Sequence, residues 1–153
     1  MGTRSRIGVM HGDKLKSVYC HWDGYLDNNG RILLEHYDSS KANHLVAMGD
    51  ISSLDKEVAI PEGVQHSFQV PLDGITVFYG RDRGETGTEF QVDEDFVSFM
   101  ERVDGCGAEY YYIMKDGVWY CGDSYNSSPI SGKLVPLAEA LADQDIAKAE
   151  IDN

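Results

Sequence analysis

The chain has 153 residues, of which 42% are hydrophobic and 25% charged, a composition that excludes a disordered tail and suits one globular domain. Its 26 acidic and 13 basic residues give a net charge of −13, which argues against direct nucleic-acid binding through phosphate neutralisation. That charge suits either a highly soluble domain or a protein that presents carboxylates to a basic partner. No apolar run approaches the roughly 20 residues of a membrane span, and no signal-peptide pattern is present, so we expect a cytoplasmic protein without membrane contact.

The three cysteines are odd in number and far apart, at Cys20, Cys106 and Cys121. They form no paired motif of the kind that binds zinc, which indicates a reducing compartment and buried, unreactive thiols. We therefore expect no metal and no cofactor.

The N-terminal segment predicts a β-hairpin. Gly12 and Asp13 suit a two-residue loop because glycine accepts a positive φ and aspartate bonds its neighbouring backbone. With that loop, position 10 faces 15, position 6 faces 19 and position 3 faces 22, and facing residues share one side of the hairpin. One side is then largely apolar and consists of Thr3, Ser5, Ile7, Val18, Cys20 and Trp22.

The other side of this hairpin, with the turn that follows it, is the first candidate binding site. Guanidinium, phenol and imidazole groups beside an aromatic turn can together bind an anion and a planar ring. The candidate residues are Arg4, Arg6, Tyr19, His21, Trp22, Asp23 and Tyr25.

Two short helices should follow the hairpin. Residues 31–37 have helical apolar spacing after an N-cap at Asp27 or Asn28, and a second helix ends at Gly49 after an N-cap at position 39 or 40. We expect the two helices to pack as a helical hairpin on the apolar side of the first sheet.

A second candidate site follows an irregular connection over residues 50–75 and a buried strand over residues 76–79. The strand leads into a glycine-rich loop that holds Arg81, Asp82 and Arg83. Such a backbone can approach an anion closely, and either arginine could make a bidentate contact. The equal alternative is a turn in which both arginines pair with the protein's own carboxylates. The glycine–lysine pattern of a P-loop is absent.

The second half of the chain predicts a helix and an aromatic hairpin. Residues 96–103 follow acidic side chains that suit a helix start, and their apolar spacing is that of a helix. Asp116 and Gly117 lie between two β-forming runs and specify a primed turn, which pairs Tyr112 with Cys121 in a doubly covered central hairpin.

Residues 137–148 predict the last helix, with Leu137, Leu141 and Ile146 facing inward. The expected fold is a single compact α+β domain over residues 1–153, with a mainly antiparallel sheet built from hairpins and about four helices packed on it.

Catalysis finds little support in the sequence. The His-x-Asp pairs that begin at His11 and His21 lie at opposite ends of one predicted strand, about 25–30 Å apart at about 3.3 Å per residue, so they cannot share a metal ion. No nucleophile elbow and no His-Glu-x-x-His helix is present. His21 with Asp23 could act as a base and its orienting group, although charged partners beside a histidine are more often structural.

Three short stretches resemble a family of small uncharacterised proteins of tailed bacteriophages and prophages: the opening Met-Gly-Thr-Arg-Ser, Trp-Asp-Gly-Tyr at 22–25 and Gly-Arg-Asp-Arg-Gly at 80–84. The resemblance covers mainly residues 1–50 and 79–88 and carries no catalytic residues. It implies an early or accessory phage protein in the cytoplasm of an infected bacterium. Such proteins often bind and disable a host or defence component.

Two functions of different class follow. The first is a non-catalytic inhibitor, of anti-CRISPR or other counter-defence type, that occupies a host or immune protein through its acidic surface or its arginine face. The second is a protein that binds, sequesters or turns over a phosphorylated small molecule, such as a nucleotide signal, through Arg4, Arg6, Arg81 and Arg83.

We predict that both arginine pairs form one anion site, because residues two apart in an extended chain point the same way. Alanine at Arg81 and Arg83 should then change the stability by less than about 1 kcal/mol, the usual range for exposed positions.

Overall fold

A computed structural model describes residues 2–125, 128–131 and 133–152. The strands are β1 (Ser5–His11), β2 (Lys14–Cys20), β3 (Ile51–Ser53), β4 (Val77–Phe78), β5 (Gln91–Asp93), β6 (Tyr110–Lys115), β7 (Val118–Asp123) and β8 (Val135–Pro136). The helices are the π-helix η1 (Leu26–Gly30), α1 (Arg31–His36), α2 (Ser39–Ala47), α3 (Tyr79–Arg83), α4 (Phe96–Gly105) and α5 (Leu137–Asp152). The elements form one α+β domain, as predicted.

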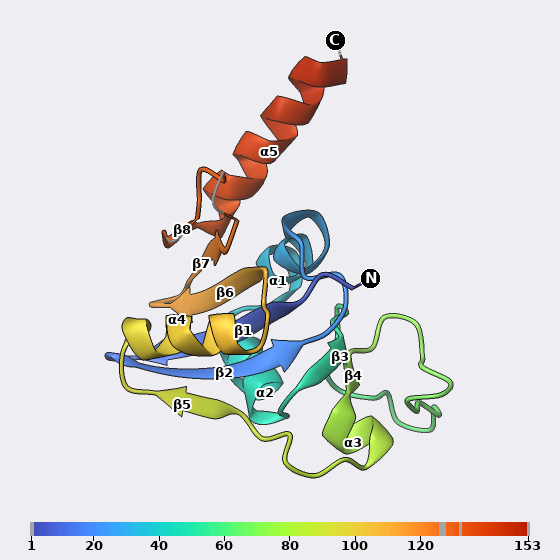
Figure 1. Cartoon of the computed structure of the whole chain (residues 1–153). Helices are drawn as coiled ribbons and strands as arrows, with labels where there is room; N and C mark the ends of the chain where they lie inside the picture. The colour runs from blue at the N-terminus through green and yellow to red at the C-terminus, as the bar shows by residue number, and fades with distance from the viewer. Residues whose placement is uncertain (1, 126–127, 132, 153) are drawn as a thin grey trace.

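The strands form one mixed sheet in the order β4-β3-β2-β1-β6-β7-β8, and β5 pairs with β2 (Figure 1). Most neighbours are antiparallel, whereas β1 with β6 and β2 with β3 run parallel. Because β1 and β6 are parallel, their first residues lie at the same end of the sheet. The last residues of β2 lie there too, since β2 is antiparallel to β1. Three segments of the chain, residues 2–4, 21–22 and 107–109, therefore meet at this end of the sheet.

Both predicted hairpin registers are confirmed. Arg6 faces Tyr19 in the first hairpin, and Tyr112 faces Cys121 in the second. The second turn takes the positive φ values of a primed turn, 51° at Asp116 and 78° at Gly117. The first ladder stops at Ser5 and Cys20, so the expected pairs at 4/21 and 3/22 lie outside it.

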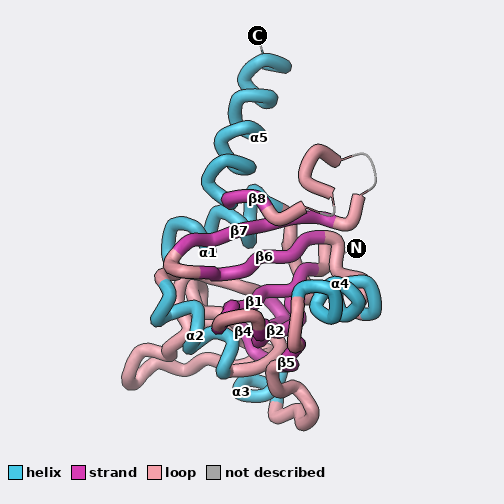
Figure 2. Tube along the Cα trace, turned by 90° about the vertical axis from the view of Figure 1, so that its left-hand side faces the viewer, coloured by secondary structure: helices cyan, strands magenta, loops and turns pink. Residues whose placement is uncertain are grey.

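Helices cover both faces of the sheet, which gives three layers (Figure 2). One face packs against α1, α2 and α5, with a core that includes Ile7, Val18, Leu33, Leu45 and Leu137. The other face packs against α4 in a smaller core of Leu15, Phe99, Val103, Ala108, Tyr111 and Ile113. The predicted packing of the α1–α2 pair on the apolar side of the first hairpin is confirmed.

The helix starts differ from the prediction in two places. Helix α1 continues from η1 with no side-chain cap, so the predicted cap at Asp27 or Asn28 is wrong. In α2 the cap is Asp38, whose carboxylate accepts a hydrogen bond from the Lys41 N–H at 2.8 Å, one residue before the predicted serines.

Helix α5 rises away from the sheet toward the C-terminus (Figure 1). Leu137 and Leu141 are buried as predicted, whereas Ile146 is 58% exposed, so the inward placement of Ile146 is wrong. Helix α5 extends beyond the sheet that it packs on. Ion pairs of Asp145 with Arg31 and of Lys148 with Asp27 connect the extended part of the helix to η1 and α1. Among the described residues no helix is long and apolar enough to cross a membrane.

Candidate functional site

A hollow of about 410 Å³ lies where the three segments meet at one end of the sheet. We call it the N-terminal hollow; it is lined by Gly2, Arg4, His21, Trp22, Gly107 and Glu109. Arg4 directly precedes β1 and Glu109 directly precedes β6, and the Glu109 N–H donates to the Arg4 carbonyl at 2.8 Å. The parallel β1–β6 pairing thus brings Arg4 and Glu109 together.

The side chains of Tyr19 and His21 lie side by side because alternate residues of an extended chain share a face. The Tyr19 hydroxyl and His21 Nδ1 are hydrogen-bonded at 2.8 Å. Burial raises the pKa of Tyr19, and the neighbouring Arg4 charge opposes that shift. The phenol is therefore protonated at neutral pH, and the Tyr19–His21 pair offers hydrogen-bonding groups beside the Arg4 charge.

Trp22 belongs to the same hollow, so its predicted place on the opposite side is wrong. The β2 strand and its ladder end at Cys20, so the alternation of faces along the strand does not determine the side of position 22. The indole packs edge-on against His21, with ring centroids 4.6 Å apart, and is 43% exposed. A Cβ on Gly2 would lie 2.5 Å from indole Cε3, so the ring fits only because position 2 is glycine.

The charges in the hollow are mixed. Gly107, with a φ of 71°, lies where a Cβ would be 3.1 Å from Arg4 Nη1. Glu109 accepts a hydrogen bond from the Tyr125 hydroxyl at 2.7 Å, which raises the pKa of Tyr125 to about 12. One guanidinium and one carboxylate therefore share the hollow, a balance that suits a ligand with a single negative group better than a polyphosphate.

Asp23 and Tyr25 are exposed but do not line the hollow. The Asp23 carbonyl accepts hydrogen bonds from the backbone of Asn29 and the side chain of Asn28, at the start of η1. Because His21 Nδ1 bonds the phenol of Tyr19, the structure gives no support for Asp23 as its orienting carboxylate.

Arg6 lies on the predicted side of the hairpin but is only 4% exposed. Its Nε donates to Ser17 Oγ at 2.8 Å and its Nη2 donates to the Ser17 carbonyl at 3.2 Å, beneath α4. Burial lowers the pKa of this guanidinium, and the nearby Cys106 partly opposes that shift. The helix that covers Arg6 removes it from the surface, so the expected exposed pair of Arg4 and Arg6 is wrong.

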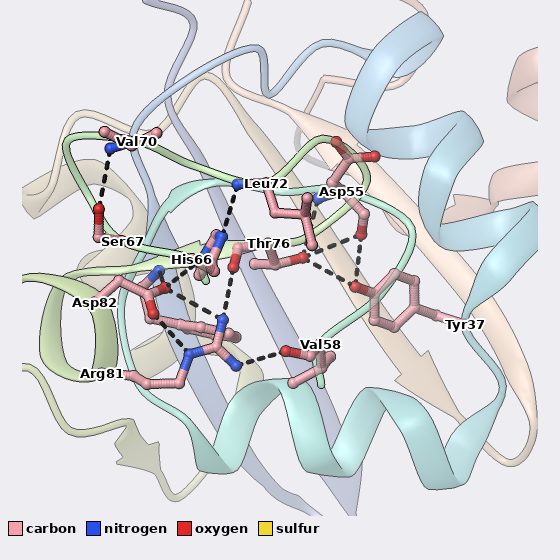
Figure 3. A network of polar contacts seen from close by, with 11 residues as sticks. Tyr37, Asp55, Val58, His66, Ser67, Val70, Leu72, Thr76, Arg81 and Asp82 are labelled. Atoms are coloured by element: carbon pink, nitrogen blue, oxygen red, sulfur yellow. Dashed lines mark hydrogen bonds and ion pairs between the residues drawn. The ribbon is translucent and has the colours of Figure 1, made fainter. Parts of the chain in front are cut away.

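Arg81 and Asp82 form a buried clamp rather than an open loop (Figure 3). Arg81 donates to Asp82, to the Thr76 carbonyl at 2.9 Å and to the Val58 carbonyl. Asp82 also accepts from the Phe78 N–H at 2.8 Å and lies 3.2 Å from His66 Nε2. We call this set the Arg81 clamp; it ties the long 55–76 connection to α3.

Arg83 takes no part in the clamp and lies over the Phe68 ring, 4.8 Å from its centroid. Residues 79–83 are helical, and two positions apart on a helix point to nearly opposite sides, so Arg81 and Arg83 do not form a pair. The prediction of one anion site made by both arginine pairs is therefore wrong. The alternative, in which the arginine bonds the protein's own carboxylate, holds for Arg81.

The sequence did not identify Gly2, Gly107 or Glu109 as part of the hollow. Glu109 directly precedes a strand that the sequence predicted, so its position in the chain was a usable signal. The proximity of Glu109 to Arg4 gave no such signal, because β1 and β6 pair across about a hundred residues. Within 2–125, 128–131 and 133–152, no group of three or more His, Cys, Asp or Glu residues could hold a metal ion.

Comparisons with protein-family models, with curated proteins and with solved structures found no significant match.

Proposed function

We propose that the protein acts by binding rather than by catalysis, and that its acidic surface occupies a basic protein partner. The observation that carries this proposal is the placement of the arginines. Arg6 and Arg81 are bonded inside the fold, Arg102 pairs with the buried Asp93 at 2.9 Å, and Arg31 pairs with Asp27 at 2.7 Å. These four arginines are engaged by the protein itself, so they are not available to an anionic ligand.

Many carboxylates, in contrast to these arginines, lie on the surface of the protein. Many exposed acids make no ion pair with any side chain that the structure describes; they include Asp13, Glu62, Asp73, Glu85, Glu101, Asp104, Asp116, Glu139 and Asp143. They come from both helical layers and from the connecting loops. The net charge of −13 therefore lies mainly on the surface, where it can steer and hold a partner of positive charge.

The biological setting in this proposal comes from the resemblance of residues 1–50 and 79–88 to phage proteins. We propose an accessory phage protein of the counter-defence type, which acts inside the infected bacterium on a host or immune protein. A basic surface is what nucleic-acid-binding immune proteins present to their targets, and an acidic protein can compete for it.

Affinity capture from infected cells at low and high ionic strength tests the proposal. Tagged protein should retain one or a few basic proteins at low salt and release them as salt screens the interaction. Reconstitution of the complex from purified components should reproduce the salt dependence. Capture of acidic partners only, or binding that ignores salt, would contradict the proposal.

A second function is favoured by the N-terminal hollow, which three of the predicted residues line: Arg4, His21 and Trp22. Arg4 beside Tyr19, His21 and Trp22 could hold a small molecule with a planar ring and one negative group. Native mass spectrometry of the purified protein would detect such a ligand. Trp22→Ala should abolish its retention, whereas Tyr25→Ala is the matched control, because Tyr25 is an aromatic residue of similar exposure outside the hollow, 40% against 43%.

A further inference from the structure

A second hollow, of about 710 Å³, lies on the side of the molecule that carries α1 and α2. It opens between the α1–α2 junction, the β6–β7 turn and the start of α5. We call it the Trp119 hollow. The sequence contains no motif that relates the segments lining this hollow. The Trp119 hollow shares no residue with the lining of the N-terminal hollow.

The floor of the Trp119 hollow is apolar and fixed in place. Trp119 and Met114 are 4% and 5% exposed, and the Trp119 indole N–H donates to the Tyr37 carbonyl at 2.8 Å. Leu34 and Val118 stand at its edges and are 39% and 45% exposed. An apolar floor with exposed apolar edges is the arrangement that buries an apolar side chain of a partner.

The rim of the Trp119 hollow is acidic. Glu35 and Asp38 line it, and among the described lining residues there is no lysine or arginine. His36 also lines the hollow, with Nε2 4.0 Å from a Glu35 oxygen. The charge of the rim is thus complementary to a cation, in keeping with the net charge of the whole chain.

We propose that the Trp119 hollow is the docking site for a basic amphipathic segment of the partner protein. An apolar side chain of that segment lies over Trp119 and Met114, and a neighbouring lysine or arginine binds Glu35 and Asp38. This inference rests on the proposed function, because it assumes a basic protein partner and names the surface that receives it.

Two peptides of equal length and positive charge provide the probe, one of leucine and lysine and the other of serine and lysine. The full-length protein is titrated with each peptide, and the binding surface is mapped by backbone amide shifts in nuclear magnetic resonance spectra. The leucine–lysine peptide should bind at least about tenfold more tightly, with the largest shifts in residues 34–40 and 114–119.

The variant Glu35→Gln with Asp38→Asn removes both rim charges while asparagine keeps the capping acceptor for α2. It should weaken binding of the leucine–lysine peptide by about tenfold. The matched control, Glu101→Gln with Asp104→Asn, removes two exposed charges from α4 on the other face of the sheet and should change affinity by less than about twofold.

The outcomes separate the two proposals. Equal affinity for both peptides, equal losses in both variants, or shifts confined to other surfaces would overturn the proposal that the Trp119 hollow is the docking site. The proposal that the protein binds a basic partner through its acidic surface would then still stand. If neither peptide binds at low salt, both the hollow and the proposed function are overturned.

Discussion

The Arg81 clamp leads to a quantitative prediction about stability. Arg81→Met keeps most of the apolar stem and removes the guanidinium. The Thr76 and Val58 carbonyls then lose a donor, and the Asp82 carboxylate, whose side chain is 2% exposed, loses its cation. Nothing else in the clamp can replace the guanidinium, since His66 and the Phe78 N–H already face Asp82.

The expected cost follows from what is left without a partner. A buried acceptor that loses its donor costs about 1–3 kcal/mol, and breaking a buried ion pair costs about 3–5 kcal/mol. The Arg81 side chain is 21% exposed, so water can reach part of the site and the lower values apply. We expect Arg81→Met to lower the free energy of unfolding by about 3–5 kcal/mol.

Urea unfolding followed by circular dichroism measures this change, and the slope with urea checks that unfolding remains two-state. Arg83→Met is the control on the same helix; it removes only a contact with the Phe68 ring and should cost about 0.5–1 kcal/mol. If Arg81→Met costs less than about 1 kcal/mol, or no more than Arg83→Met, the clamp does not hold the 55–76 connection.

Three further predictions concern protonation, thiol reactivity and backbone packing. Burial raises the pKa of Asp82, but hydrogen bonds from its neighbours outweigh burial and leave the pKa below the ordinary 3.8. The ionised Asp82 therefore stabilises the fold above pH 3.8, and this stabilisation is lost as the pH falls through the lower pKa of the folded state. Asp82→Asn should thus lessen acid destabilisation in melting curves recorded at different pH values. Burial raises the pKa of Cys20 to about 11 and that of Cys121 to about 12, so a disulfide reagent near neutral pH should label only the half-buried Cys106 in the folded chain. Gly49→Ala should lower the free energy of unfolding by more than about 1 kcal/mol in urea titrations, because position 49 has a φ of 90° and its Cβ would clash with a backbone carbonyl.

Features that depend on local sequence were predictable. Gly12 with Asp13 and Asp116 with Gly117 fixed two hairpin registers, because turn chemistry determines which residues face each other across a two-residue loop. Helix α4 began where the acidic residues indicated, with Asp95 accepting from the Ser98 N–H at 2.8 Å. Each of these signals acts within a few residues of the structure that it specifies.

Features that depend on distant pairing were not predictable from the same signals. The sequence showed hairpins β1–β2 and β6–β7 but nothing that set β1 beside β6 in parallel, and this pairing creates the N-terminal hollow. Strand β3 has three residues and β5 has three, too few for a period-two pattern to be visible. Arg6 illustrates the consequence, since its side of the hairpin was correctly assigned and only the tertiary position of α4 decides that it is buried.

The spacing of the arginines was misleading for a physical reason. In a chain with net charge −13, a guanidinium near a buried carbonyl or carboxylate gains several hydrogen bonds and also compensates a negative charge, so the fold itself competes for it. Arg6 and Arg81 are both bonded within the fold, and each binds at least one backbone carbonyl. The exposed carboxylates make the surface acidic, and long-range attraction then favours basic partners before any contact forms. Shape adds selectivity among such partners, and a concave surface with a fixed apolar floor can supply it. In this molecule that floor is provided by Trp119, beneath a rim of Glu35 and Asp38.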